Sequence, residues 1–278
     1  MGYKILHKEV LGPNTKLIEV KAPLITSRAR AGQFIILRAN EKGERIPLTL
    51  SDWNMDKGTI TLVFQEVGKT TFYLGSLGPG DEIEDVVGPL GKPSEIKNYG
   101  TVIMVGGGLG IAPIYPIARD LKNAGNKILT IIGARTGDLL FWKDRFEEIS
   151  DDFKICTDDG SCGIKGVVTV PLEDILKKIK PDLVFAIGPA IMMKFVAKTT
   201  RPYGIKTIVS LNAIMVDGTG MCGACRVEVG GKTLFSCIDG PEFDAHKVDF
   251  ELLMKRLNTY CKEEKTAMEF YKAHAAGK

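Results

Sequence analysis

The chain has 278 residues, of which 44% are hydrophobic and 26% are charged, and its formal net charge is +3. This composition predicts a globular protein of at least two domains and excludes a disordered chain. Because the charge is nearly balanced and no cluster of Lys and Arg is interleaved with aromatic residues, a nucleic-acid-binding protein is also excluded.

The first 98 residues contain short β-type runs that turn residues separate. These runs occupy residues 16–25, 32–40, 45–53, 58–67 and 81–91. Short strands at this spacing are typical of a small antiparallel barrel or sandwich. We therefore predict an antiparallel β-barrel domain over residues 1–98.

The pattern changes near Tyr99, where apolar runs begin to alternate with helical stretches such as residues 111–125. The apolar runs are residues 101–110, 127–134, 153–161, 182–188 and 206–212. This alternation predicts a Rossmann-like parallel α/β domain over residues 99–210. Residues 101–118 carry no charge, but four glycines and two prolines indicate a strand, a loop and a helix start rather than a membrane span.

Residues 211–278 form a third region, which begins with a segment rich in glycine and cysteine. Its last part, residues 248–271, has apolar side chains at helical spacing and predicts one amphipathic helix. The start of the chain lacks the apolar run of a signal peptide, so we expect a cytoplasmic protein. In that compartment its six cysteines would serve as free thiols or metal ligands.

The cysteine segment contains the pattern D-x4-C-x2-C-x11-C, formed by Asp217, Cys222, Cys225 and Cys237. It matches the plant-type ferredoxin loop with aspartate in place of the first cysteine, and predicts a [2Fe-2S] cluster whose ligands are these four residues. A structural zinc site made by the three cysteines and His246 is an alternative, because these ligand types suit tetrahedral zinc. A glycine-rich turn with buried thiols is the third possibility. The cluster is favoured because three glycines let the backbone close around it.

A glycine-rich loop lies between the first strand and the first helix of the α/β domain. Gly106, Gly107, Gly108 and Gly110 leave backbone amides free to bind a pyrophosphate at the helix start. Their spacing does not complete the standard dinucleotide fingerprint, so a tight packing turn is the alternative. Later loops at residues 133–138, 157–163 and 188–193 follow other strands, and ligands bind at that edge of such sheets.

Two barrel segments could bind a phosphorylated cofactor. Arg45 begins the run Arg-Ile-Pro-Leu-Thr, and Arg binds phosphate through two hydrogen bonds. Residues 68–71, Gly-Lys-Thr-Thr, could receive a diphosphate at the start of a short helix. Taken alone, an arginine such as Arg45 is more often a surface ion-pair residue than a ligand.

Together, the three segments resemble the ferredoxin-NADP reductase superfamily. Residues 45–49 resemble its flavin-binding strand, residues 68–71 its flavin pyrophosphate helix, and residues 106–113 its pyridine-nucleotide loop. The cysteine segment resembles the electron-transfer subunit of dihydroorotate dehydrogenase. It is more similar to the small subunit of NADH-dependent reduced ferredoxin:NADP oxidoreductase, also described as sulfide dehydrogenase, in which an aspartate joins three cysteines around the cluster.

The resemblance implies an oxidoreductase subunit that passes electrons between NAD(H), FAD and a [2Fe-2S] cluster. It implies a heterodimer with a larger flavin and iron-sulfur subunit that performs electron bifurcation and reaches ferredoxin and NADP(H). The dihydroorotate dehydrogenase subunit is the alternative within redox enzymes. A zinc-stabilised nucleotide-binding regulatory protein is the alternative from another class.

The resemblance also implies the cofactor-binding residues. FAD would be held by Arg45, Thr49, Lys69, Thr70 and Thr71, and the nicotinamide nucleotide by Gly107, Gly108, Gly110, Arg135, Asp158 and Gly188. Further cofactor-binding positions are Pro47, Leu48, Leu62, Val63, Gly68, Ile111, Ala112, Pro113, Gly133, Ala134 and Met192.

Some positions depart from the superfamily or bear on its chemistry. Pro47 stands where many relatives have tyrosine, so stacking of that side chain on the flavin is not expected. No catalytic side chain is expected, since hydride transfer needs no protein nucleophile. Arg135 suits a 2'-phosphate and Asp138 opposes it, and the family favours NAD(H).

Overall fold

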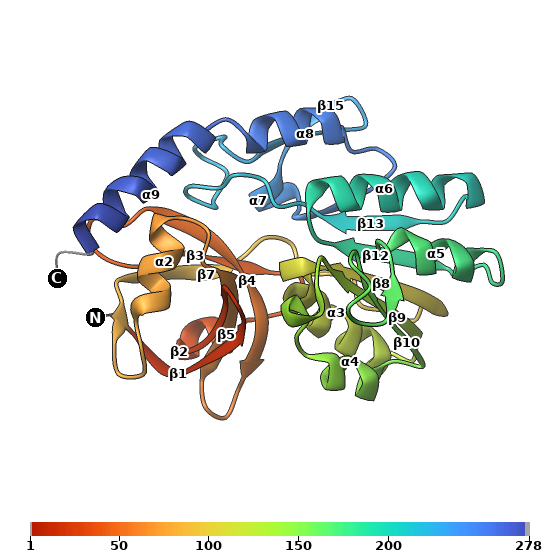
Figure 1. Ribbon diagram of the computed structural model, residues 1–278, viewed down its shortest axis with the longest axis horizontal. Helices are drawn as coiled ribbons and strands as arrows, with labels where there is room; N and C mark the ends of the chain where they lie inside the picture. Colours follow the sequence, from red (N-terminus) through yellow and green to blue (C-terminus); the bar gives the residue numbers. More distant parts are fainter. Residues whose placement is uncertain (1, 276–278) are drawn as a thin grey trace.

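The computed structural model describes residues 2–275. A β-barrel lies at one end of the molecule and an α/β layer at the other. The C-terminal region crosses over both and ends beside the barrel (Figure 1).

The N-terminal sheet is antiparallel and has seven strands in the order β6-β1-β2-β5-β4-β3-β7. Because β6 and β7 are consecutive in sequence but lie at opposite edges of the sheet, the sheet curls into a nearly closed barrel, which confirms the predicted fold class. Its interior is filled by apolar side chains such as Ile18, Leu50 and Phe64, all fully buried. The elements are β1 (Tyr3–Gly12), β2 (Thr15–Lys21), α1 (Pro23–Thr26), β3 (Phe34–Arg38), β4 (Arg45–Asn54), β5 (Thr59–Gln65), α2 (Lys69–Ser76), β6 (Glu82–Ile83) and β7 (Asp85–Leu90).

The second sheet has the order β11-β10-β9-β8-β12-β13-β16, and all its neighbouring strands are parallel except β13 and β16. Both faces are covered by helices, so its strands are continuous apolar runs, as parallel sheets require. The elements are β8 (Thr101–Gly107), η1 (Gly108–Gly110), α3 (Ile111–Asn123), β9 (Lys127–Ala134), η2 (Gly137–Leu139), α4 (Lys143–Ile149), β10 (Asp152–Thr157), β11 (Ile164–Lys165), α5 (Thr169–Leu176), β12 (Leu183–Ile187), α6 (Ala190–Thr200), η3 (Arg201–Tyr203) and β13 (Thr207–Ser210).

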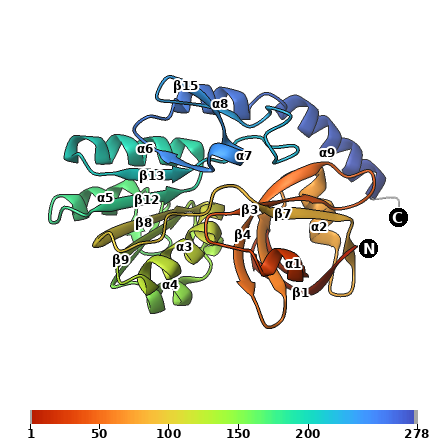
Figure 2. The same cartoon turned by 180° about the vertical axis from the view of Figure 1, so that it is seen from behind.

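The helices of this domain lie on opposite faces of the sheet. One core contains buried side chains of α5 and α6, such as Leu172 and Met193, and the other contains those of α3 and α4, such as Ile114 and Phe146. Seen from behind, α3 lies on the side of the sheet that faces the barrel, beside β4 (Figure 2). The predicted Rossmann-like arrangement is therefore confirmed.

The C-terminal region is joined to the second sheet. Its elements are β14 (Arg226–Val229), β15 (Lys232–Phe235), α7 (Ser236–Asp239), β16 (Glu242–Asp244), α8 (Phe250–Leu257) and α9 (Cys261–Ala275). β16 pairs antiparallel with β13, with Ser210 opposite Glu242. The region that follows residue 210 therefore supplies an edge strand to the sheet of the preceding domain.

The predicted C-terminal helix is present, but as two helices rather than one continuous helix over residues 248–271, because α8 ends at Leu257 and α9 starts at Cys261. The turn between them satisfies the last carbonyl groups of α8: Asn258 Nδ2 donates to the oxygen of Met254, and Thr259 Oγ1 donates to that of Arg256. Such local side-chain bonds compete with helix continuation.

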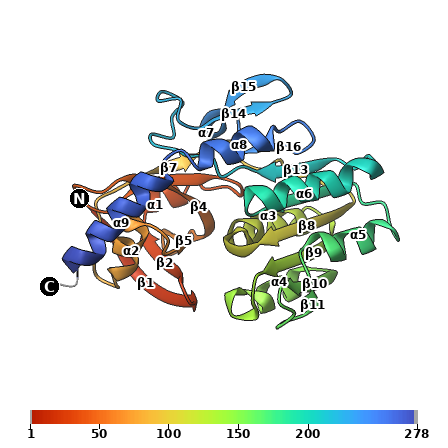
Figure 3. The ribbon, with the colours of Figure 1, turned by 45° about the horizontal axis from the view of Figure 1, so that its top comes forward.

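The two helices pack on different parts of the molecule. α8 contacts α6 and β14, whereas α9 contacts α2 of the barrel and lies across it (Figure 3). Along residues 2–275, none of the helices combines the length and the apolarity that crossing a bilayer requires.

Candidate functional site

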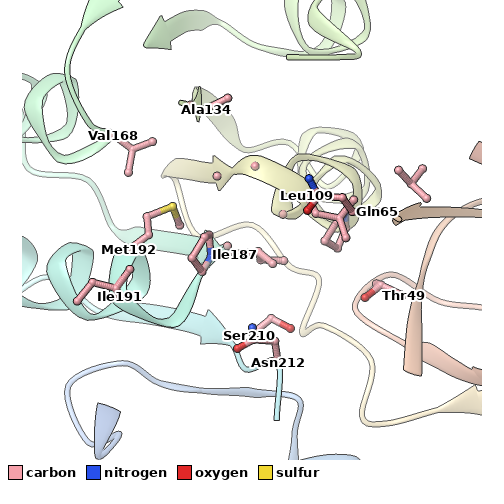
Figure 4. Close-up of a pocket in the computed structure, with 18 of the residues that line it drawn as sticks. Thr49, Gln65, Leu109, Ala134, Val168, Ile187, Ile191, Met192, Ser210 and Asn212 are labelled. Atoms are coloured by element: carbon pink, nitrogen blue, oxygen red, sulfur yellow. The ribbon is translucent and has the colours of Figure 1, made fainter. Parts of the chain in front are cut away.

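A cleft of about 1050 Å³ lies between the barrel and the carboxyl ends of the parallel strands. Its walls come from β4 and β5 on one side and from the loops after β8, β9, β10, β12 and β13 on the other (Figure 4). The sequence-predicted residues that line it are Pro47, Leu48, Thr49, Val63, Gly107, Gly108, Gly110, Pro113, Gly133, Ala134, Arg135, Asp158, Gly188 and Met192. A cleft lined from both domains allows two planar ring systems to meet.

The glycine loop after β8 is built for close backbone approach. A Cβ atom at Gly110 would lie 2.2 Å from the carbonyl oxygen of Ile187, and Gly108 has a φ of +54°. A Cβ at Gly107 would lie 2.1 Å from the sulfur of Met192, a residue that also lines the cleft (Figure 4). No larger residue fits at Gly107 and Gly110 without displacing its neighbours. The less buried backbone of Gly108 and Leu109 lines the cleft, where it suits a phosphate-bearing ligand.

The structure places eight predicted cofactor residues outside the cleft. The side chains of Leu62, Ile111 and Ala112 are fully buried, so these positions can offer a ligand only backbone atoms. Arg45 is exposed at the start of β4. Gly68, Lys69, Thr70 and Thr71 form the start of α2, away from the cleft walls.

The start of α2 is polar and open. Thr71 Oγ1 accepts hydrogen bonds from the backbone N–H groups of Val67 and Gly68, each at 3.0 Å. Thr70 Oγ1 donates to Glu44 Oε2 at 3.0 Å, and Lys69 Nζ lies 3.9 Å from Glu44 Oε1. A Cβ built at Gly68 would meet no atom within 4 Å. The helix start therefore has room in front of its first amide groups, as an anion requires.

Several cleft residues were missed by the sequence analysis. Gln65, Ser210 and Asn212 project toward the cleft from the ends of β5 and β13 (Figure 4), and Phe34 and Ser51 also line it. The rule that ligands bind at the carboxyl ends of parallel strands would have identified Ser210 and Asn212. Gln65 and Phe34 carry no comparable local signal.

Arg135 and Asp158 lie side by side at the edge of the cleft. Each follows a neighbouring parallel strand, and the N–H of Asp158 donates to the carbonyl oxygen of Ala134 at 3.1 Å. Asp138 does not belong to the lining, and its carbonyl oxygen lies against Gly12 of the barrel. Among the described residues, Arg135 and Asp158 therefore remain the charged groups that line the cleft.

Cys156 is a buried cysteine in the cleft wall. Burial raises the pKa of its thiol to about 11, so it stays protonated near neutral pH. A thiol of this kind is a packing residue rather than a nucleophile.

The four predicted cluster ligands occur as two adjacent pairs. Cys225 Sγ donates to Cys237 Sγ at 3.2 Å, and both side chains are buried. Asp217 Oδ2 accepts a hydrogen bond from the backbone N–H of Cys222 at 2.8 Å. A two-iron cluster takes two protein ligands at each iron, so this pairing fits it.

Asp217 and Cys237 differ in protonation, and this decides what each must do to bind a metal. The N–H of Thr219, which donates to Asp217 Oδ1 at 2.7 Å, holds the pKa of the Asp217 carboxyl below its usual range. Asp217 is therefore a carboxylate. Burial, followed by the hydrogen bond from Cys225, raises the pKa of Cys237 to about 12. Metal ligation by this thiol must release a proton.

Within residues 2–275, no group of three or more His, Cys, Asp and Glu side chains is placed to hold a single metal ion, and this applies to the predicted cluster ligands as well as to the zinc alternative. The fourth ligand of the zinc alternative is also engaged elsewhere. His246 Nε2 instead hydrogen-bonds to Thr200 Oγ1 at 3.0 Å, and desolvation followed by the charge of Arg201 lowers the pKa of His246.

Two known families match the chain. The iron-sulfur cluster binding domain of dihydroorotate dehydrogenase B matches residues 212–249, which contain the four predicted ligands. The oxidoreductase NAD-binding domain matches residues 104–198, which supply most of the loops along the α/β side of the cleft.

Individual proteins are similar over most of their length. A dihydroorotate dehydrogenase B (NAD(+)) electron transfer subunit homolog from Thermotoga maritima is 53% identical over 90% of this chain and 88% of its own. A probable dihydroorotate dehydrogenase B (NAD(+)) electron transfer subunit from Methanopyrus kandleri is 36% identical over 78% of this chain and 79% of its own. A chain from a solved structure of the NADH-dependent reduced ferredoxin-NADP oxidoreductase, described in connection with flavin-based electron bifurcation, is 49% identical. That match has a TM-score of 0.93 and covers 98% of both chains.

Proposed function

The chain belongs to the family of dihydroorotate dehydrogenase B electron-transfer subunits and their homologues, and we propose that it passes electrons between NAD(H) in the cleft and a larger partner subunit. It is an oxidoreductase that uses NAD(H), FAD and a [2Fe-2S] cluster. When bound, the flavin exchanges two electrons with the nicotinamide and single electrons with the cluster.

We propose that the two sides of the cleft orient the two ring systems. Thr49, Gln65 and the backbone of β4 would support the flavin ring, and the glycine loop after β8 would hold the nucleotide phosphates. Arg135 and Asp158 stand where the adenosine half of the nucleotide would contact the sheet edge. Burial of the rings between mostly apolar walls excludes water from the transfer.

The observation that carries this proposal is the position of the cluster loop against the barrel. A Cβ built at Gly218, next to Asp217, would lie 2.7 Å from side-chain atoms of Ile36 and Leu90. Ile36 is on β3, the strand that also presents Phe34 to the cleft. The cluster loop therefore contacts a strand that also lines the cleft. This contact supports the proposal that electrons pass between a flavin in the cleft and the cluster.

The larger partner is proposed to carry flavin and iron-sulfur centres of its own. The structural match over nearly the whole chain favours the electron-bifurcating oxidoreductase. In that case we propose that the partner reaches ferredoxin and NADP(H). The names of the sequence relatives favour a dihydroorotate dehydrogenase complex as the second candidate. Copurification of the native complex, followed by assays with NADPH plus ferredoxin and with dihydroorotate, separates the two.

The electron path is tested on the anaerobically prepared chain loaded with FAD, iron and sulfide. NADH should bleach the flavin absorption and then produce the paramagnetic resonance of a reduced cluster. In Cys222→Ser, NADH should still bleach the flavin, while the cluster signal is lost or strongly altered. Cys261→Ser is the matched control, because Cys261 lies at the start of α9 and should leave both signals intact. A chain that binds flavin but is not reduced by NADH would contradict the proposal.

A further inference from the structure

A second cavity, of about 560 Å³, lies between α2 of the barrel and the C-terminal helix α9. We infer that this cavity holds the adenosine end of FAD, so that α9 completes the flavin site. The inference rests on the proposed function, because it assumes that the chain binds FAD through the barrel. The cavity is lined by Lys69, Lys262, Glu263, Thr266, Ala267 and Phe270.

The first argument is that the main cleft does not reach the start of α2. The cleft walls on β4 begin at Pro47, and neither Arg45 nor the residues 68–71 line them. Lys69, the first residue of α2, lines the second cavity instead. A dinucleotide with its ring against β4 and its diphosphate at α2 would therefore point its far end toward α9.

The second argument concerns the space around the diphosphate position. Gly68 precedes α2 without a side chain to cap the helix, and a Cβ there would find nothing within 4 Å. The first amide groups of a helix have no partners within the helix. α9 lies across α2 (Figure 3), and Lys69 at the helix start lines the second cavity together with residues of α9, so groups on α9 lie next to a ligand bound there.

The third argument is the chemistry of the lining. Lys69 and Lys262 approach the cavity from the two helices, and two ammonium groups suit a diphosphate. Phe270 offers an aromatic ring on which an adenine can stack. The Glu263 carboxylate can accept hydrogen bonds from ribose hydroxyl groups. This set matches the phosphate, base and sugar of an adenosine diphosphate unit.

A carboxylate beside the cavity already contacts the groups that a diphosphate would bind. Glu44 ion-pairs with Lys69 and accepts a hydrogen bond from Thr70. A diphosphate would take over these donors, and Lys262 would then offset the nearby carboxylates. The position of α9 is fixed by more than this cavity, since Lys272 Nζ lies 5.8 Å from the centre of the Phe72 ring on α2.

The test compares FAD with FMN, which has the same ring and lacks the adenylate. Dissociation constants of both flavins are measured by fluorescence on flavin-free chain refilled with each. The intact chain should prefer FAD, and Lys262→Ala should weaken FAD binding by about threefold to tenfold, as for loss of one partly exposed ionic contact. Phe270→Ala should act in the same direction. FMN binding should be unchanged in both variants.

Lys265→Ala is the matched control, because Lys265 is an exposed lysine of α9 that does not line the cavity. It should keep the preference for FAD, and Lys262→Arg should restore most of it. An unchanged ratio of FAD to FMN affinity in both Lys262→Ala and Phe270→Ala would overturn this inference while leaving the proposed function intact. A native chain that binds neither flavin would overturn both.

Discussion

Arg119 of α3 reaches across the boundary between the two domains and places its Nη1 atom 2.7 Å from Oδ1 of Asp52 on β4. Arg145 adds a second contact, with Nη1 3.4 Å from the other oxygen of Asp52. The Arg119 guanidinium also lies 5.2 Å from the centre of the Trp53 ring. These contacts fix the barrel against α3, and thereby set the width of the cleft.

Asp52→Ala should destabilise the protein by about 1–3 kcal/mol, because it removes the carboxylate shared by two partly buried guanidinium groups, of which Arg119 keeps only its ion pair with Asp120. The free energy of unfolding in urea measures this. Lys177→Ala is the control, because its ion pair with Glu173 is exposed at both ends, and its loss should leave the free energy of unfolding almost unchanged. Equal effects of the two substitutions would contradict the role given to Asp52.

Glu242 should make stability depend on pH. Its side chain accepts a hydrogen bond from Ser94, and burial raises the pKa of its carboxyl from 4.5 to about 7. The folded state therefore binds the proton more tightly than the unfolded state, so the contribution of Glu242 to stability falls as pH rises from 4.5 to about 7.

In Glu242→Gln this decline should disappear, because the amide is uncharged and still accepts from Ser94. Above about pH 7 the variant should be more stable than the native chain by about 1–3 kcal/mol. Urea unfolding at a series of pH values measures the difference. A difference that stays constant across the series would show that Glu242 titrates normally.

Gly107 and Met192 should be energetically coupled. Gly107→Ala would force the Met192 thioether out of its position, and we expect NADH affinity to fall about tenfold because the displaced side chain enters the nucleotide site. Adding Met192→Ala should recover most of that loss, as measured by NADH titration of all four chains.

Gly110→Ala provides the contrast for this pair. Its new methyl group meets the backbone oxygen of Ile187, which cannot rotate away, so it should destabilise the fold by about 3 kcal/mol. Met192→Ala should not rescue it. If Met192→Ala recovered both glycine variants equally, the clash assigned to Gly107 would not be specific.

Asp217 should be needed for cluster retention. Asp217→Ala removes the proposed iron ligand, and we expect it to lose about half or more of the bound iron and sulfide. Asp217→Cys should keep the cluster and change its midpoint potential, since a thiolate replaces a carboxylate oxygen. Iron analysis, paramagnetic resonance and a redox titration are the measurements.

Asp217 also supports the loop through two backbone N–H groups, so a control for loop support is required. Asp239→Ala is this control, because the Asp239 carboxylate accepts a hydrogen bond from the N–H of Phe235 at 2.8 Å but is not a proposed iron ligand. The Asp239→Ala variant should keep its iron. Loss of iron from both variants to the same extent would favour a purely structural role for Asp217.

The sequence by itself determined the two main layers and the chemistry of their loops. Alternating runs before Tyr99 and continuous apolar runs after it follow from burial on one face or on both, which is a local property of each strand. The glycine loop after β8 and the spacing of Asp217, Cys222, Cys225 and Cys237 were likewise readable, because backbone freedom and ligand chemistry belong to residues close together in the chain.

The tertiary structure decided which distant segments meet. Glu242 is partly buried because β16 joins a sheet whose other strands precede residue 211, and Gln65 faces the cleft because the α/β domain packs beside β5. The division of the predicted C-terminal helix sends α8 to α6 and α9 to α2. Apolar periodicity specifies that a helix buries one face, but the surface that receives that face is set by the whole fold.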